Sequence, residues 1–158
     1  MELKKGWQSY ELDRIAQDLV LKHRDSLNQS HKMRETVAYG LERFWGEYLR
    51  LQANGETKKA AYWKATWDKF VEVMNQAGLS LPNDEIDPVK TAQIEQMANK
   101  LWQLTIPEQR VALAVLTQLC DSLVWWTQRF KPIENSQLSG NKQTPKRNLD
   151  KPKPKNRS

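Results

Sequence analysis

The sequence has almost nothing with which to build disulfides, membrane spans or secretion signals. Its only cysteine, Cys120, has no partner for an internal disulfide and lies in an apolar run, so we expect a small buried side chain rather than a reactive thiol. No window approaches the roughly 18 apolar residues of a membrane span, and no apolar stretch follows the charged amino terminus as in a signal peptide. We therefore expect a cytoplasmic protein without membrane contact.

Motifs of catalytic and cofactor sites are missing as well. Neither His23 nor His31 has a second histidine, a cysteine or a pair of carboxylates at metal-ligand spacing. The chain contains no glycine-rich phosphate loop and no Gly-x-Ser-x-Gly motif, and nothing predicts two carboxylates converging in a pocket. Although residues distant in sequence can assemble an active site, these absences predict a protein that is not an enzyme and needs no metal or other cofactor.

No alternating run of Val, Ile or Thr predicts a β-strand, whereas apolar residues recur at helical spacing throughout the first 130 residues. A chain of 158 residues has the length of one ordinary domain. The sequence therefore predicts an all-α fold, a single bundle of about five helices within residues 1–130. We expect these helices over residues 9–27, 31–52, 57–77, 87–103 and 105–130.

The last predicted helix has the clearest start and the richest apolar face. Thr105 and Glu108 have the spacing of a capping box, in which each side chain satisfies one free backbone amide of the first turn. We expect this helix to lie at the centre of the bundle. Its inward positions are Ala112, Val115, Leu116, Leu119, Leu123, Trp126 and Phe130.

Charge is distributed unevenly along the chain. The formal net charge is +6, and from Lys131 onward eight basic residues accompany only two acidic ones, so the preceding 130 residues carry 17 of each sign. Residues 131–158 also hold four of the seven prolines. This composition predicts a disordered basic tail over residues 131–158. Such a tail either binds polyanions without sequence preference or serves only to keep the chain soluble.

Two predicted helices carry basic and aromatic residues on the face opposite their apolar stripe. Because a helix turns by about 100° per residue, these residues form two strips without acidic members, the first of Lys32, Tyr39, Arg43 and Arg50 and the second of Lys58, Tyr62 and Lys69. Basic side chains at this spacing can follow a phosphate backbone, and a tyrosine between them can stack on an unpaired base. The alternative is that both strips are ordinary solvated helix faces.

Two adjacent tryptophans in the last predicted helix must point in different directions. Trp126 belongs to the apolar stripe, whereas Trp125 shares a mostly polar face with Ala114, Gln118, Asp121 and Arg129. Tryptophan is enriched as an anchor of protein interfaces. We therefore interpret Trp125 and Arg129 as a contact for a partner protein, with the packing of another helix over Trp125 as the alternative.

The last predicted helix also resembles a known family. The run from Glu108 to Ala114 and the ending from Trp126 to Phe130, Trp-Thr-Gln-Arg-Phe, are similar to the closing helix of the small all-helical subunits of type III or type I CRISPR effector complexes. That resemblance implies a role in antiviral defence as an RNA-binding or DNA-binding small subunit. Such subunits stack along the interior of a ribonucleoprotein filament, contact nucleic acid through basic helix faces and perform no catalysis.

The predicted function is therefore a non-enzymatic structural subunit of a ribonucleoprotein assembly. Its expected partners are single-stranded RNA or DNA, bound through the two basic strips, and either other protein subunits or neighbouring copies of itself, bound through the last helix. The alternative is a helical protein–protein adaptor with no nucleic-acid role. These two functions differ in their salt dependence, because counterion release weakens phosphate binding steeply as salt rises.

Overall fold

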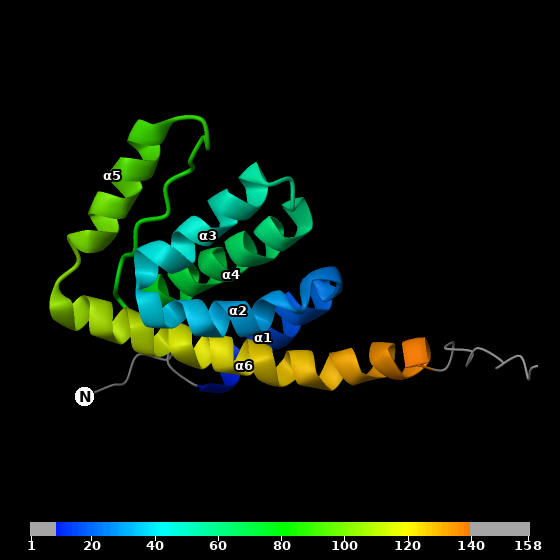
Figure 1. The fold of residues 1–158 in the computed structure, drawn as a ribbon. Helices are drawn as coiled ribbons and strands as arrows, with labels where there is room; N and C mark the ends of the chain where they lie inside the picture. The colour runs from blue at the N-terminus through cyan, green and yellow to red at the C-terminus, as the bar shows by residue number, and fades with distance from the viewer. Residues whose placement is uncertain (1–8, 140–158) are drawn as a thin grey trace, which may run out of the picture.

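The computed structural model describes residues 9–139 and the side chains of residues 11–131, and this part of the chain is all-helical (Figure 1). The α-helices are α1 (Ser9–Lys22), α2 (Gln29–Thr36), α3 (Leu41–Ala53), α4 (Thr57–Gln76), α5 (Thr91–Trp102) and α6 (Ile106–Ser139). Two short 3₁₀ turns connect them, η1 (Arg24–Ser26) before α2 and η2 (Val37–Tyr39) before α3. The all-α prediction is confirmed, with six α-helices in the described chain instead of five.

The long helix α6 does not lie at the centre of the bundle, where we expected it, but forms the base on which α1 and α2 lie (Figure 1). Its predicted inward face is confirmed: the first five members are fully buried, and the aromatic pair at the end is partly buried against the same core. Cys120 is buried beside this face, as expected, and burial raises the pKa of its thiol. The capping box is also present, since Thr105 and Glu108 exchange backbone-to-side-chain hydrogen bonds of 3.2 and 3.3 Å.

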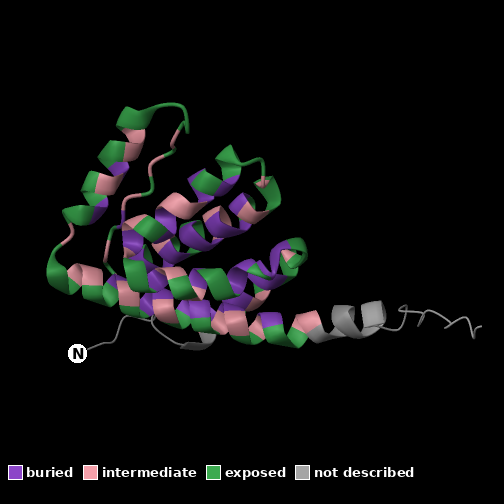
Figure 2. Cartoon of the chain, in the orientation of Figure 1, coloured by how far each residue is buried: buried purple, intermediate pink, exposed green. Residues whose placement is uncertain are grey.

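A helical hairpin of α3 and α4 packs above this layer and supplies the largest core side chains. The ring centroids of Phe44 and Trp63 lie 4.9 Å apart, and those of Trp67 and Phe70 lie 5.4 Å apart. Helix α5 packs on α3 and carries mostly exposed or half-buried residues (Figure 2). The core therefore lies between α6 with its neighbours on one side and the α3–α4 hairpin on the other.

The prediction of one continuous helix over residues 31–52 is wrong, because the helix is interrupted at Gly40. This glycine has φ 106° and ψ 168°, a conformation that side chains essentially exclude. Sequence periodicity hides the break, since Val37 and Leu41 lie four residues apart and both remain buried. The helix predicted over residues 9–27 also ends early, at Lys22, and the chain passes through η1 before α2 begins.

Two other predicted boundaries also differ. Asp87 does not start α5; its carboxylate instead accepts a 3.1 Å hydrogen bond from the amide of Val89, which makes a turn ahead of the helix at Thr91. Helix α6 continues past Phe130 to Ser139, so the first nine residues of the predicted disordered tail are helical. The remaining tail, residues 140–158, lies outside the described residues.

The break at Gly40 gives a matched pair of glycine substitutions on neighbouring turns. Gly40→Ala should destabilise the fold by about 1–3 kcal/mol, because alanine is strained at this backbone conformation. Gly46→Ala should stabilise it by about 0.5–1 kcal/mol, since Gly46 lies within α3 and an added Cβ meets nothing within 4 Å. Urea unfolding of both variants measures the difference. Shifts of the same sign would contradict the role assigned to Gly40.

Candidate interaction surfaces

One side of α6 faces away from the bundle and carries few free charges. We define the α6 outer face as its exposed residues at helical spacing, namely Pro107, Val111, Ala114, Gln118, Asp121, Trp125 and Arg129. Val111 is 47% and Trp125 46% exposed, which is high for large apolar side chains on one helix face. The alternative that another helix covers Trp125 is therefore wrong for the described chain.

Both charged members of the α6 outer face are already engaged. The Arg34 Nε donates a hydrogen bond of 2.5 Å to the carboxylate of Asp121, which joins α2 to α6. The guanidinium of Arg129 lies 3.8 Å from the ring centroid of Trp125, close enough for a cation–π interaction. The face is therefore close to electrically neutral, and its apolar members determine what it can bind.

A notch of about 380 Å³ adjoins this face, between α1 and α6. Its lining includes Asp13, Ser122 and the two indoles of Trp125 and Trp126, which meet edge to face at 4.7 Å. The Ser122 hydroxyl donates a hydrogen bond of 2.9 Å to Asp13 and so ties the two helices together. In the described part of the chain the buried Nε1 of Trp126 has no acceptor.

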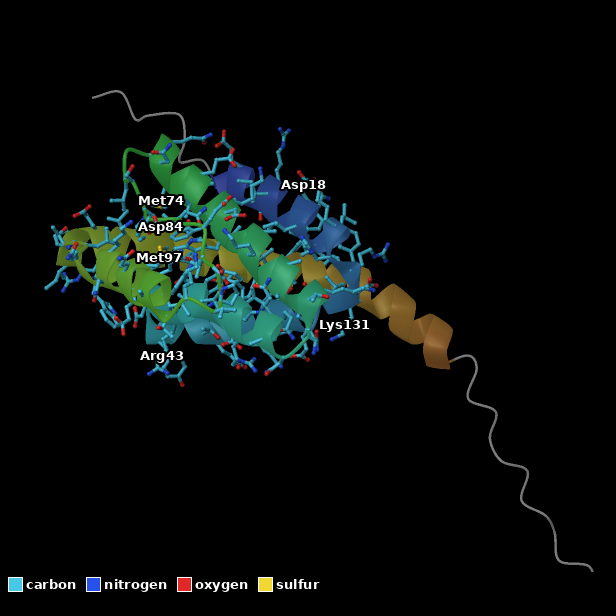
Figure 3. All side chains as sticks on the ribbon, turned by 90° about the horizontal axis from the view of Figure 1, so that it is seen from above. Asp18, Arg43, Met74, Asp84, Met97 and Lys131 are labelled. Atoms are coloured by element: carbon cyan, nitrogen blue, oxygen red, sulfur yellow. The ribbon has the colours of Figure 1, made fainter. Side chains whose placement is uncertain are left out.

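The first predicted strip does not lie on one helix. Lys32 belongs to α2 and Tyr39 to η2, whereas Arg43 and Arg50 follow the break at Gly40 on α3. Arg50 is also engaged, because its Nε donates a 2.7 Å hydrogen bond to Glu47 one turn earlier. Lys32 and Arg43 are exposed and form no ion pair among residues 11–131, and Tyr39 is 69% exposed. Arg43 lies at the outer edge of the molecule when seen from above (Figure 3).

The second predicted strip is wrong in one decisive member. Tyr62 is fully buried, so its ring cannot stack on a base. Lys58 and Lys69 are exposed, but each has an acidic neighbour at 3.3 Å, Asp25 in η1 and Glu72 on the next turn of α4. Exposed pairs of this kind contribute little stability. The strip itself has no acidic member, as predicted, but acidic residues outside it pair with both of its lysines.

Tyr62 is instead the centre of a buried polar network that joins three helices. Its hydroxyl lies 2.6 Å from the Ser30 hydroxyl of α2, which lies 2.7 Å from the Thr127 hydroxyl of α6. The ring of His23 stacks on the Tyr62 ring, with centroids 5.1 Å apart. Burial raises the pKa of Tyr62 to about 12. The position thus serves packing and hydrogen bonding inside the fold.

Basic residues that are distant in the sequence come together around Glu56, at one end of the bundle. Lys59 donates a 2.8 Å hydrogen bond to the Glu56 carboxylate, which lowers the pKa of this carboxyl, and the charges of Arg50 and Lys32 lower it further. These cations come from α4, α3 and α2 in turn. Sequence reasoning missed the cluster, since helical spacing groups residues only within one helix.

No protein-family model matches the chain, and neither a curated protein nor a solved structure matches it. Among the helices of residues 9–139, none combines the length and apolar character needed to cross a bilayer. Within the same described part, no three His, Cys, Asp or Glu side chains come together in a group that can hold a metal ion.

Proposed function

We propose that this protein is a non-enzymatic assembly subunit that binds a second copy of itself through the α6 outer face. The observation that carries the proposal is the large exposed apolar area of Val111 and Trp125 on an otherwise nearly neutral helix face. Trp125 still exposes nearly half of its surface to water beside Arg129 and Trp126, and burial of that apolar area against another protein is favourable. A neutral face also meets its own copy without like-charge repulsion.

The spacing along α6 suits an antiparallel pairing with twofold symmetry. Val111 and Trp125 each lie seven residues from Gln118, on opposite sides of it. A twofold axis through Gln118 therefore places Val111 of each copy opposite Trp125 of the other. The interface then contains two identical contacts, as an isologous interface requires. Ala114, a small residue near the axis, allows the two helix backbones to approach closely.

The size of this face predicts a weak contact. At a rise of about 1.5 Å per residue, the face from Pro107 to Arg129 is on the order of 33 Å long, and a helix with its side chains is about 10 Å wide. One such face buries far less than the roughly 800 Å² per partner of a stable standard interface. We therefore expect pairing in the micromolar range, strengthened wherever a scaffold holds several copies together.

Removal of the anchor should abolish this pairing without unfolding the protein. Trp125→Ala should reduce self-association at least tenfold, because it removes the largest apolar contact, while the thermal melt should change little at a half-exposed position. Sedimentation equilibrium at protein concentrations of roughly 10–500 μM, which cover the expected micromolar association, measures the self-association. Trp102→Ala is the control, since Trp102 is also exposed but ends α5 outside the α6 outer face. A wild-type chain that stays monomeric throughout would refute the proposal.

A second function is favoured by Lys32, Tyr39 and Arg43, which we propose as a contact for single-stranded RNA or DNA. Lys32 and Arg43 have no ion pair in the described chain, so a phosphate does not have to displace a carboxylate from them. Tyr39 is the most exposed tyrosine described and offers its ring to a base. The similarity of α6 to the closing helix of CRISPR small subunits supports both contacts, since those subunits stack on one another and touch nucleic acid. If the α6 outer face alone is functional, the chain is a protein–protein adaptor.

A further inference from the structure

The N-terminus of α4 opens into a shallow notch that neither proposed contact uses. The notch has a volume of about 320 Å³ and lies between η1 and the turn from α3 to α4. Its lining comes from both segments, namely Asp25 and Ser26 on one side and Gly55, Glu56, Thr57, Lys58 and Lys59 on the other. Since a water molecule takes about 30 Å³ of liquid volume, there is room for a tetrahedral oxyanion and several waters.

Three backbone amides at this helix end have no acceptor. The first amide of α4 with a backbone partner is that of Ala60, which donates 3.0 Å to the carbonyl of Glu56. The amides of Thr57, Lys58 and Lys59 make no hydrogen bond in the described chain, and the side chain of Glu56 does not cap them. Free amides at a helix start carry a partial positive charge and attract anions.

A buried hydroxyl gives an independent indication of a ligand. Ser26 lines the notch and is only 2% exposed, yet its hydroxyl has no hydrogen-bond partner among the described residues. The Ser26 oxygen is not among the fully enclosed side-chain atoms that lack a partner in the described chain, so a ligand in the notch that Ser26 lines can reach it. An oxyanion in the notch supplies the missing acceptor.

The charges at the notch favour an anion that competes with two carboxylates. Lys58 and Lys59 occupy the first turn of α4, where the helix dipole disfavours cations, and the turn has no acidic residue. Lys58 lies 3.3 Å from Asp25, and Lys59 lies 2.8 Å from Glu56. Both pairs are solvent-accessible, so a more highly charged oxyanion can replace the carboxylates as the partner of the lysines.

We propose that the notch at the N-terminus of α4 binds a phosphate group. The amides of Thr57, Lys58 and Lys59 and the hydroxyl of Ser26 donate hydrogen bonds to the phosphate oxygens, and the two lysine ammonium groups balance its charge. The phosphate comes either from a free phosphate compound or from a nucleic-acid strand, and these two sources share this recognition chemistry. The inference is independent of the α6 outer face.

The full-length protein, labelled with ¹⁵N, tests the proposal by titration with inorganic phosphate at constant ionic strength against chloride. Saturable shifts are expected at the amides of Thr57, Lys58 and Lys59. The N-terminus of α6 is the internal control, because Thr105 already caps it and its amides should not respond. A second titration uses a single-stranded oligonucleotide. If the same amides respond to it, the phosphate comes from a strand; a response to inorganic phosphate alone indicates a free phosphate compound.

Variants with opposite expected effects make the test specific. Lys58→Gln combined with Lys59→Gln should weaken phosphate binding about tenfold, whereas Glu56→Gln should strengthen it a few-fold by removing the competing carboxylate. Lys69→Gln, which removes one lysine charge further along α4, should change it little. The absence of a saturable shift with both ligands, or weakening by Lys69→Gln equal to that of the double variant, would overturn the proposal.

Discussion

Replacing Tyr62 with alanine is expected to destabilise the fold by about 3–5 kcal/mol, the usual cost of truncating a buried aromatic side chain. Tyr62 is fully buried, and its ring stacks on His23 where α4 packs against α1 and η1. The truncation therefore opens a cavity between α4 and the neighbouring α1 and η1. It also removes the hydroxyl that lies 2.6 Å from Ser30.

Two further variants separate the cavity from the hydrogen bond. Tyr62→Phe should cost only about 0.5–1.5 kcal/mol, since Ser30 keeps the Thr127 hydroxyl as a partner at 2.7 Å. Tyr39→Ala should change stability by less than about 0.5 kcal/mol, because that tyrosine is exposed. Urea unfolding at neutral pH gives all three values. Similar midpoints for Tyr62→Ala and Tyr39→Ala would show that the burial of Tyr62 is not what holds these helices together.

The burial of Tyr62 marks where reasoning from sequence failed and why. Helix periodicity assigns each helix one inward face, and for α4 that face contains Trp63, Trp67 and Phe70, all of which are buried. However, α4 contacts α3 on one side and α1, η1, α2 and α6 on the other. Its second contact buries Tyr62, which a single-stripe pattern places toward solvent, together with Thr66 at the edge of the stripe.

Sequence patterns predicted a helix well where residues close together in the sequence determine it. The helix expected over residues 57–77 is observed as α4 at Thr57–Gln76, and the capping box starts α6 as expected. Gly40 was missed because its backbone angle depends on how α2 and α3 pack on their neighbours, and glycine within an apolar period gives no separate warning. The cations around Glu56 were missed for a similar reason, since three helices supply them.

The same distinction applies to the interaction surfaces. The exposure of Trp125 follows from its position on α6 alone, because the helix has one buried face and Trp125 lies off it. The two basic strips required knowledge of how separate helices sit together, and only Lys32, Tyr39 and Arg43 of their seven members remain exposed without an ion pair among the described residues. Those three residues form the test of the nucleic-acid contact.

Lys32→Glu combined with Arg43→Glu should weaken binding to single-stranded RNA or DNA by at least tenfold and leave helicity unchanged, since both positions are exposed. Each phosphate contact that is lost should also reduce the slope of log affinity against log salt by about 0.7. Fluorescence anisotropy with a labelled oligonucleotide at several salt concentrations measures both quantities. A chain truncated after Ser139 avoids binding through the lysine-rich end.

The matched control reverses two charges at other exposed positions, so that both variants have the same net charge. Arg14→Glu combined with Lys90→Glu makes the same change in net charge at exposed positions on α1 and just before α5. If Lys32 and Arg43 contact phosphates, their reversal lowers both affinity and salt slope, whereas the control lowers affinity slightly and keeps the slope. Tyr39→Ala should then cost a further 1–3 kcal/mol or so of binding free energy through lost stacking. Equal losses in the two charge-reversal variants would mean that binding depends only on net charge, and the α6 outer face would remain as the function of an adaptor.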